Sequence, residues 1–190
     1  MTDVLAGLPA EPIAMVTIPD TWHAVTLPSV WARHVLGILG DRSGAVLEDA
    51  FVRQMVWFIF PGGAADWPET AALGVRVLPT GGDVTLAGPD GCRKVMVWHR
   101  SPRTPSPLTD PDELRAAIEY TVGPLDQAAA LGPVWACRYC GAPVRDAHLV
   151  DQIESMSGPG WSSYACGPCW STTVRGGPGR RLHAVQEGPR

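Results

Sequence analysis

The sequence predicts an α+β fold, with a small and mostly antiparallel sheet, one or two helices and a separate C-terminal module. Three observations support this prediction. Short apolar runs end at turn-forming residues every 8–15 positions, which is typical of an antiparallel sheet. Two segments carry apolar residues at helical spacing. Four of the five cysteines lie in the last third of the chain, in two C-x-x-C pairs.

Short apolar segments from residue 45 to residue 98 are expected to form the strands of the sheet. The longest is a continuous apolar run that ends at Pro61-Gly62-Gly63, which is typical of a strand buried on both faces. The expected strands are Ala45–Leu47, Met55–Phe60, Gly74–Leu78, Val84–Leu86 and Val95–Trp98. Residues 1–20 carry turn formers and scattered apolar residues, and we expect them to be loosely ordered.

Two helices are expected within residues 21–131, which we take as one α+β domain. The first has Ser29 as its N-cap, and four of its apolar residues share one face: Trp31, Val35, Ile38 and Leu39. The second has Asp110 as its N-cap and ends at Gly123-Pro124. A short further helix is expected around 126–131, and Gly132-Pro133 marks the domain boundary.

The paired cysteines predict a metal site. Twenty-five residues separate the pair Cys137 and Cys140 from the pair Cys166 and Cys169. Each C-x-x-C turn can aim two thiolates at one ion, and four sulfurs in a tetrahedron suit Zn²⁺. The spacer reads as strand, turn and strand, so residues 132–170 resemble a zinc ribbon. Four thiolates fill the coordination sphere, which indicates a structural zinc cofactor and no catalytic residue.

Two other readings of the cysteines remain open, a redox dithiol or disulfide and an iron–sulfur or rubredoxin-like site. The tetrapeptide Cys166 to Cys169 resembles a thioredoxin-type active site, but that chemistry needs a strand-to-helix junction in a βαβ unit, which we do not expect here. Cys92 has no partner in the sequence and is expected on a loop or strand edge. His148 is expected to be a polar strand residue rather than a ligand.

The chain is expected to be cytoplasmic, without a membrane partner. Its start has no basic region or long apolar stretch, and the longest apolar run has six residues where a span needs about 20. The thiols should therefore stay reduced, which favours metal over disulfide.

Charge is distributed unevenly along the chain. Its net charge is −4, which argues against a globally basic nucleic-acid binder. Residues 171–190, expected to form a flexible tail, carry four arginines against one glutamate, net +3. The candidate nucleic-acid contacts are Arg175, Arg180, Arg181, Trp161 and Tyr164. A solvated tail and aromatic residues packed over the cysteine turns are the alternatives.

Catalytic motifs are scarce in this sequence. It lacks a phosphate-binding loop, a G-x-S-x-G element and a paired-histidine motif. The acidic pair Glu48-Asp49 reads as a turn at a strand end. A cleft that brings Glu48 and Asp49 together with Arg53 and His99 would indicate an enzyme.

Residues 22–120 carry several apolar and glycine segments that resemble short actinobacterial proteins. They include Val35-Leu-Gly-Ile-Leu-Gly-Asp41, Phe58-Ile-Phe-Pro61-Gly-Gly and Leu78-Pro-Thr-Gly-Gly-Asp83. Those proteins in turn resemble the trailing half of the bifunctional primase/polymerase-like domain. The resemblance implies a non-catalytic relative, because the aspartates of that family's leading half have no match here.

Together these features predict a non-enzymatic zinc-ribbon adaptor or accessory protein. It would act through protein contacts and, at its C-terminal end, weak nucleic-acid contacts. The alternative is an enzyme, or a degenerate primase/polymerase-like relative that retains nucleotide-binding capacity.

Overall fold

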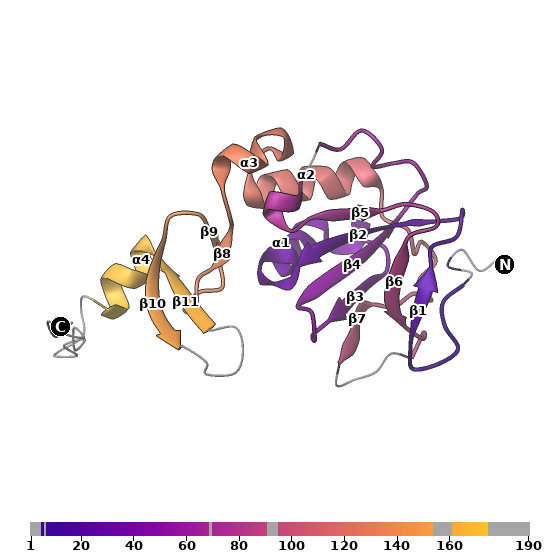
Figure 1. The fold of residues 1–190 in the computed structure, drawn as a ribbon, viewed down its shortest axis with the longest axis horizontal. Coiled ribbons are helices and arrows are strands. Elements are labelled where there is room, and N and C mark those ends of the chain that lie inside the picture. Colours follow the sequence, from indigo (N-terminus) through magenta and orange to yellow (C-terminus); the bar gives the residue numbers. More distant parts are fainter. Residues whose placement is uncertain (1–4, 6, 69, 91–94, 154–160, 175–190) are drawn as a thin grey trace, which may run out of the picture.

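A computed structural model of the chain describes residues 5, 7–68, 70–90, 95–153 and 161–174 (Figure 1). Its strands are β1 (Ile13–Thr17), β2 (His23–Pro28), β3 (Val46–Asp49), β4 (Gln54–Ile59), β5 (Arg76–Leu78), β6 (Asp83–Ala87), β7 (Met96–Arg100), β8 (Trp135–Ala136), β9 (Pro143–Val144), β10 (Ala147–Ile153) and β11 (Trp161–Cys166). Its helices are α1 (Ser29–Leu39), α2 (Pro111–Val122), α3 (Ala128–Leu131) and α4 (Gly167–Cys169), the last continued by a π-helical turn at Trp170–Val174. Among the residues that the structure describes, no helix has the length and apolar character needed to cross a membrane.

A five-stranded antiparallel sheet organises the first 131 residues, in the order β5-β2-β4-β3-β7. This confirms the predicted α+β class with mostly antiparallel pairing. The central strand β4 is buried on both faces from Met55 to Ile59, as its continuous apolar run predicted. Side chains alternate across a strand, so β4 must be covered from both sides.

Two apolar layers cover the two faces of this sheet (Figure 1). On one face, α1 and α2 pack over Val25, Leu27 and Trp57. On the other face, the antiparallel pair β1–β6 packs over Phe58, whose ring meets that of Trp22 edge to face at 5.1 Å. The sheet is therefore the middle layer of three.

The N-terminal segment differs from its prediction. Residues 1–20 were expected to be loosely ordered, yet β1 pairs with β6 over its whole length, and Leu5 and Ile18 are buried in the second apolar layer. Gly88 permits this arrangement, because a Cβ there would lie 2.8 Å from the carbonyl oxygen of Glu11. The pairing joins residues 66 or more positions apart, which local composition cannot reveal.

The two long helices begin in different ways. At α2 the Asp110 side chain accepts hydrogen bonds from the backbone N–H groups of Asp112 (2.9 Å) and Glu113 (3.1 Å), which confirms the predicted N-cap. At α1 the prediction was wrong, because Ser29 is the first helical residue and its side chain caps nothing. The Ser29 N–H instead donates to the Arg53 carbonyl at 2.8 Å, so the neighbouring hairpin turn supplies the acceptor.

A buried carboxylate joins α1 to the edge of the sheet. Glu48 on β3 accepts two hydrogen bonds from the Arg33 guanidinium (2.9 and 3.1 Å) and lies 2.6 Å from Nε2 of His99 on β7. Burial acts to raise the pKa of Glu48, but the bonds from His99 and Arg33 outweigh it and lower the pKa below its usual value. The ionised carboxylate therefore stabilises the folded state at pH values above about 4.3, and this contribution is lost as the pH falls through the lowered pKa.

We expect Glu48→Gln to lower the free energy of unfolding by about 1–3 kcal/mol at neutral pH, because a carboxylate that accepts charged hydrogen bonds is lost. The difference from the wild type should shrink as the pH falls below about 4.3. Urea unfolding at several pH values measures both effects. Asp126→Asn, at an exposed carboxylate, is the control, and a Glu48→Gln effect equally large at all pH values would contradict the assignment.

Candidate metal centre

The first cysteine turn connects β8 to β9. The Gly141 N–H donates to the Cys137 carbonyl at 2.8 Å, and the Cys137 N–H donates to the Ala142 carbonyl at 2.9 Å. Gly141 has φ = +74°, a left-handed conformation that a glycine adopts without strain. This closed loop holds the Cys137 and Cys140 side chains on the same side.

The second cysteine turn lies at the end of a strand. Cys166 is the last residue of β11 and the N-cap of α4, and Cys169 ends that short helix. This corrects one expectation, because the chain does place Cys166 at a strand-to-helix junction. The strand belongs to the antiparallel hairpin β10–β11 and not to a βαβ unit, so the thioredoxin-type context is only partly present.

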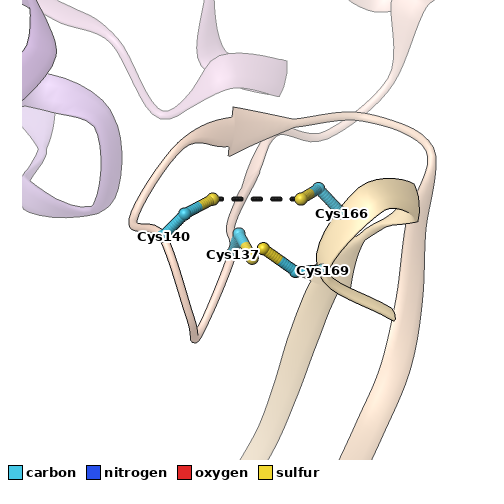
Figure 2. A group of neighbouring side chains, drawn as sticks. All are labelled: Cys137, Cys140, Cys166 and Cys169. Carbon is cyan, nitrogen blue, oxygen red and sulfur yellow. Dashed lines mark hydrogen bonds between the residues drawn. The ribbon is translucent and has the colours of Figure 1, made fainter. Parts of the chain in front are cut away.

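The four sulfurs converge on one point (Figure 2). All four Sγ atoms lie within 4.8 Å of one another, and those of Cys140 and Cys166 are 3.8 Å apart. Each of these four cysteines is a free thiol in the structure. Cys137 is buried at 2% exposure and Cys140 is exposed, so the cluster lies just beneath the surface. The predicted ligand set is thus brought together, and it can hold a metal ion.

Proton distribution within the cluster is uneven. Burial acts to raise the pKa of Cys137, but hydrogen bonds from the backbone of Cys166, Cys140 and Tyr139 outweigh it and lower the pKa to about 6. A hydrogen bond with Cys166, together with burial, raises the pKa of Cys169 to about 12. Neighbouring thiolates repel one another, so without a cation the negative charge concentrates on Cys137. A bound metal cation would remove that repulsion.

Aromatic and polar contacts fix the two turns relative to each other. The Trp135 and Tyr164 rings stack with their centroids 4.2 Å apart. Cys137, which directly follows β8, forms an isolated parallel β-bridge with Tyr164 on β11. Arg138 donates to the Ser163 hydroxyl at 3.2 Å. His148 stacks on Trp170 at 5.3 Å and is not part of the sulfur cluster, in line with its prediction as a strand residue.

The cysteine module, residues 132–174, is fastened to the helical face of the first domain. Arg145 donates hydrogen bonds to the carbonyls of Val122, the last residue of α2, and of Gly132. His34 Nε2 on α1 lies 2.8 Å from the carbonyl oxygen of Gly141, the residue that follows Cys140. Val134 packs against the apolar layer beneath the helices.

The sequence did not predict that Arg145 and His34 hold the cysteine module against the helices. A cation near the end of a helix is a favourable arrangement, but Arg145 is 23 residues from Val122, and only the fold brings them together. His34 stands on the exposed face of α1, where helical periodicity predicts solvent. The predicted boundary at Gly132-Pro133 does fall between α3 and β8.

The structure describes only some of the other residues that the sequence singled out, namely the candidate nucleic-acid contacts and Cys92. Tyr164 is half-buried with one ring face on Trp135, which agrees with the packing alternative. Trp161 lies on β11, but its side chain is outside the described part of the chain. Residues 175–190, with the three predicted arginine contacts, also lie outside it, and so does Cys92.

The residues named for an enzymatic cleft do not converge as a set. Glu48 lies within hydrogen-bond distance of His99, but the arginine that donates to Glu48 is Arg33 and not Arg53. Asp49 belongs to the opposite face of the sheet, and Arg53 lies in the turn before β4.

No protein-family model, no curated protein and no solved structure matches this chain. The resemblance to the primase/polymerase-like domain therefore stays a prediction.

We expect Arg145→Gln to loosen the cysteine module from α2, because two partly buried carbonyls lose their charged donor. The free energy of unfolding should fall by about 1–3 kcal/mol, and amide exchange should accelerate around residues 134–145. Hydrogen–deuterium exchange with mass spectrometry measures this. Arg103→Gln, at an exposed ion pair, is the matched control, and identical exchange in both variants would refute the role of Arg145.

Proposed function

We propose that this protein is a non-enzymatic accessory or adaptor protein whose residues 132–170 form a structural zinc ribbon. The observation that carries the proposal is the separation of 3.8 Å between the Cys140 and Cys166 sulfurs. With zinc–sulfur bonds of about 2.3 Å, the edge of a regular tetrahedron is about 3.8 Å. The Cys140 and Cys166 sulfurs already stand at that spacing, and all four sulfurs lie within 4.8 Å of one another.

Zinc is the ion that this donor set favours. Four soft thiolates in tetrahedral geometry suit zinc or an iron–sulfur centre, and two strand-linked cysteine turns are typical of zinc ribbons. All four positions are filled by protein sulfurs, so the ion would be structural and leave no site for a substrate or water.

The module depends on such an ion for stability. Its buried described residues are few and small, namely Cys137, Ser163 and Ala165. A module of this size buries too little apolar surface to fold alone, whereas structural zinc supplies on the order of 10–16 kcal/mol in small peptides. The metal would thus be the main source of stability in residues 132–170.

The position of the metal-stabilised cysteine turns, next to α1, supports an adaptor role. The first cysteine turn is tied to α1 through His34, so the ion would also fix the exposed side of the module relative to the first domain. Tyr139 and Leu149 are exposed large apolar side chains on that module. Aromatic and apolar groups held on a rigid support are the usual anchors of protein contacts, and we place the protein partner there, in the cytoplasm.

The purified protein should contain one zinc ion per chain, measured by inductively coupled plasma mass spectrometry. Cys140→Ser should reduce the zinc content at least about tenfold under mild chelation, because a tetrahedral site then lacks one thiolate. Cys92→Ser is the control, since Cys92 belongs to neither cysteine pair. Iron in place of zinc, or a Cys137–Cys140 disulfide in the native protein, would overturn the proposal.

Nucleic-acid binding, the second part of the adaptor proposal, should be weak and dependent on salt. Residues 171–190 supply a net charge of +3 while residues 1–131 carry −6, from 9 basic and 15 acidic residues. Joint replacement of Arg175, Arg180 and Arg181 by Ala should reduce it, and the logarithm of affinity should fall with the logarithm of salt with a slope of about −2 to −3. Fluorescence anisotropy with single- and double-stranded oligonucleotides measures this. Undetectable binding at low salt would leave the protein adaptor alone.

A further inference from the structure

The four clustered cysteines differ in how far a solute can reach them. Cys137 is buried, whereas Cys140 is exposed on the turn between β8 and β9. Cys166 and Cys169 are partly exposed. A small oxidant in solution therefore reaches the Cys140 sulfur most readily, and the burial of Cys137 protects that sulfur.

A second sulfur stands close to that of Cys140. Its Sγ is 3.8 Å from the Sγ of Cys166, and the two cysteines belong to different turns (Figure 2). A disulfide bond is about 2.05 Å long, so the two sulfurs have to approach each other by about 1.8 Å. Cys166 is held in the β10–β11 hairpin, where it pairs with Ala147, while Cys140 lies in a loop. Cys140 is therefore the residue that has to move.

Metal binding would keep both of these sulfurs in their reactive form. This step rests on the proposed structural zinc site, because a thiol that coordinates a metal cation is present as the thiolate. The thiolate, and not the thiol, is the form that a hydroperoxide oxidises. An exposed thiolate beside a second thiolate is the arrangement of a reactive cysteine with its resolving partner.

We propose that Cys140 is a site of oxidation by hydrogen peroxide, with Cys166 as its resolving cysteine, and that the resulting disulfide releases the metal and frees the first cysteine turn from α1. The Cys140 thiolate attacks one peroxide oxygen, the O–O bond breaks, and hydroxide leaves, which gives a sulfenic acid. The Cys166 thiolate then attacks the Cys140 sulfur, the S–O bond breaks, and a second hydroxide leaves. Each hydroxide takes a proton from solvent, so two thiolates lose two electrons and one peroxide is reduced to two waters.

The oxidation acts on the residues beside Cys140 as well as on the metal site. A disulfide removes two of the four thiolates, and a structural zinc site needs four protein ligands. Gly141 follows Cys140, and its carbonyl oxygen is the one that lies 2.8 Å from Nε2 of His34. The exposed Tyr139 precedes Cys140. A displacement of Cys140 therefore reaches both the contact with α1 and the surface where we place the protein partner.

The test treats the full-length, zinc-loaded protein with hydrogen peroxide and follows released zinc with a zinc-binding dye. One zinc ion per chain should be released as a Cys140–Cys166 disulfide forms, identified by mass spectrometry of peptides whose free thiols have been alkylated. Dithiothreitol and added zinc should restore the starting state. Zinc retained under excess peroxide, or a first disulfide between any other two cysteines, would overturn this inference alone. A protein that holds no zinc before peroxide is added would refute the proposed function, and this inference with it.

Two variants that preserve the number of ligands test the assigned roles. Cys140→His and Cys169→His each leave three cysteines and one histidine, a donor set that also binds zinc. Cys169→His keeps the Cys140–Cys166 pair and should release zinc under peroxide at about the wild-type rate, whereas Cys140→His should release it at least about tenfold more slowly. Amide exchange around residues 134–145 should accelerate on oxidation in Cys169→His and not in Cys140→His. Equal release rates in the two variants would contradict the assignment, and the disulfide mapped in the wild type decides where a variant fails to bind zinc.

Discussion

The two-sided burial of β4 is the constraint on which the rest of the structure depends. Trp57 faces one apolar layer and Phe58 the other, so both faces of the sheet must be kept from water. The helices cover only one face. The other face requires β1 and β6, and this requirement explains why a segment rich in turn formers is nevertheless ordered at Leu5 and Ile18. The order of the N-terminus is therefore a consequence of the core and not of its own sequence.

Local patterns in the sequence predicted many of the elements, although the strands β1 and β2 were not among those expected. The apolar run of β4, the Asp110 cap and the two cysteine pairs are each contained within a few residues, and each is found as predicted. Contacts between distant elements were not accessible in this way. The Ser29 cap was wrong because an acceptor from the turn at Arg53 took its place, and a turn with φ = +57° at an arginine has no local signature. The β1–β6 pairing and the Arg145 contacts were also not predicted, because they join residues that are far apart in the sequence.

The cluster of four sulfurs likewise combines a local pattern that the sequence predicts with distant contacts that it does not. Spacing alone identified the ligands, since each C-x-x-C turn fixes its own pair of sulfurs. Spacing could not show that the first turn is held against α1 by His34 or that the Trp135 and Tyr164 rings hold the strands together. A metal ion held by these four cysteines would therefore also stabilise the contact between the first cysteine turn and α1.

The sheet also separates the cysteine module from the face that β1 and β6 cover. The cysteine module contacts His34 and Val122 and packs its own Val134 against the apolar layer, all on the helical side. On the other side, β1 and β6 cover the face of the sheet that carries Phe58. Between them stands β4 with large side chains packed on both faces, and such cores shift little in response to a change at one surface. Coupling between the two sides requires an element with two arrangements, and a strand closely packed on both sides is the least suited to be one. If a metal ion binds the four sulfurs, its removal should therefore leave the packing of β1 and β6 on the far face of the sheet unchanged.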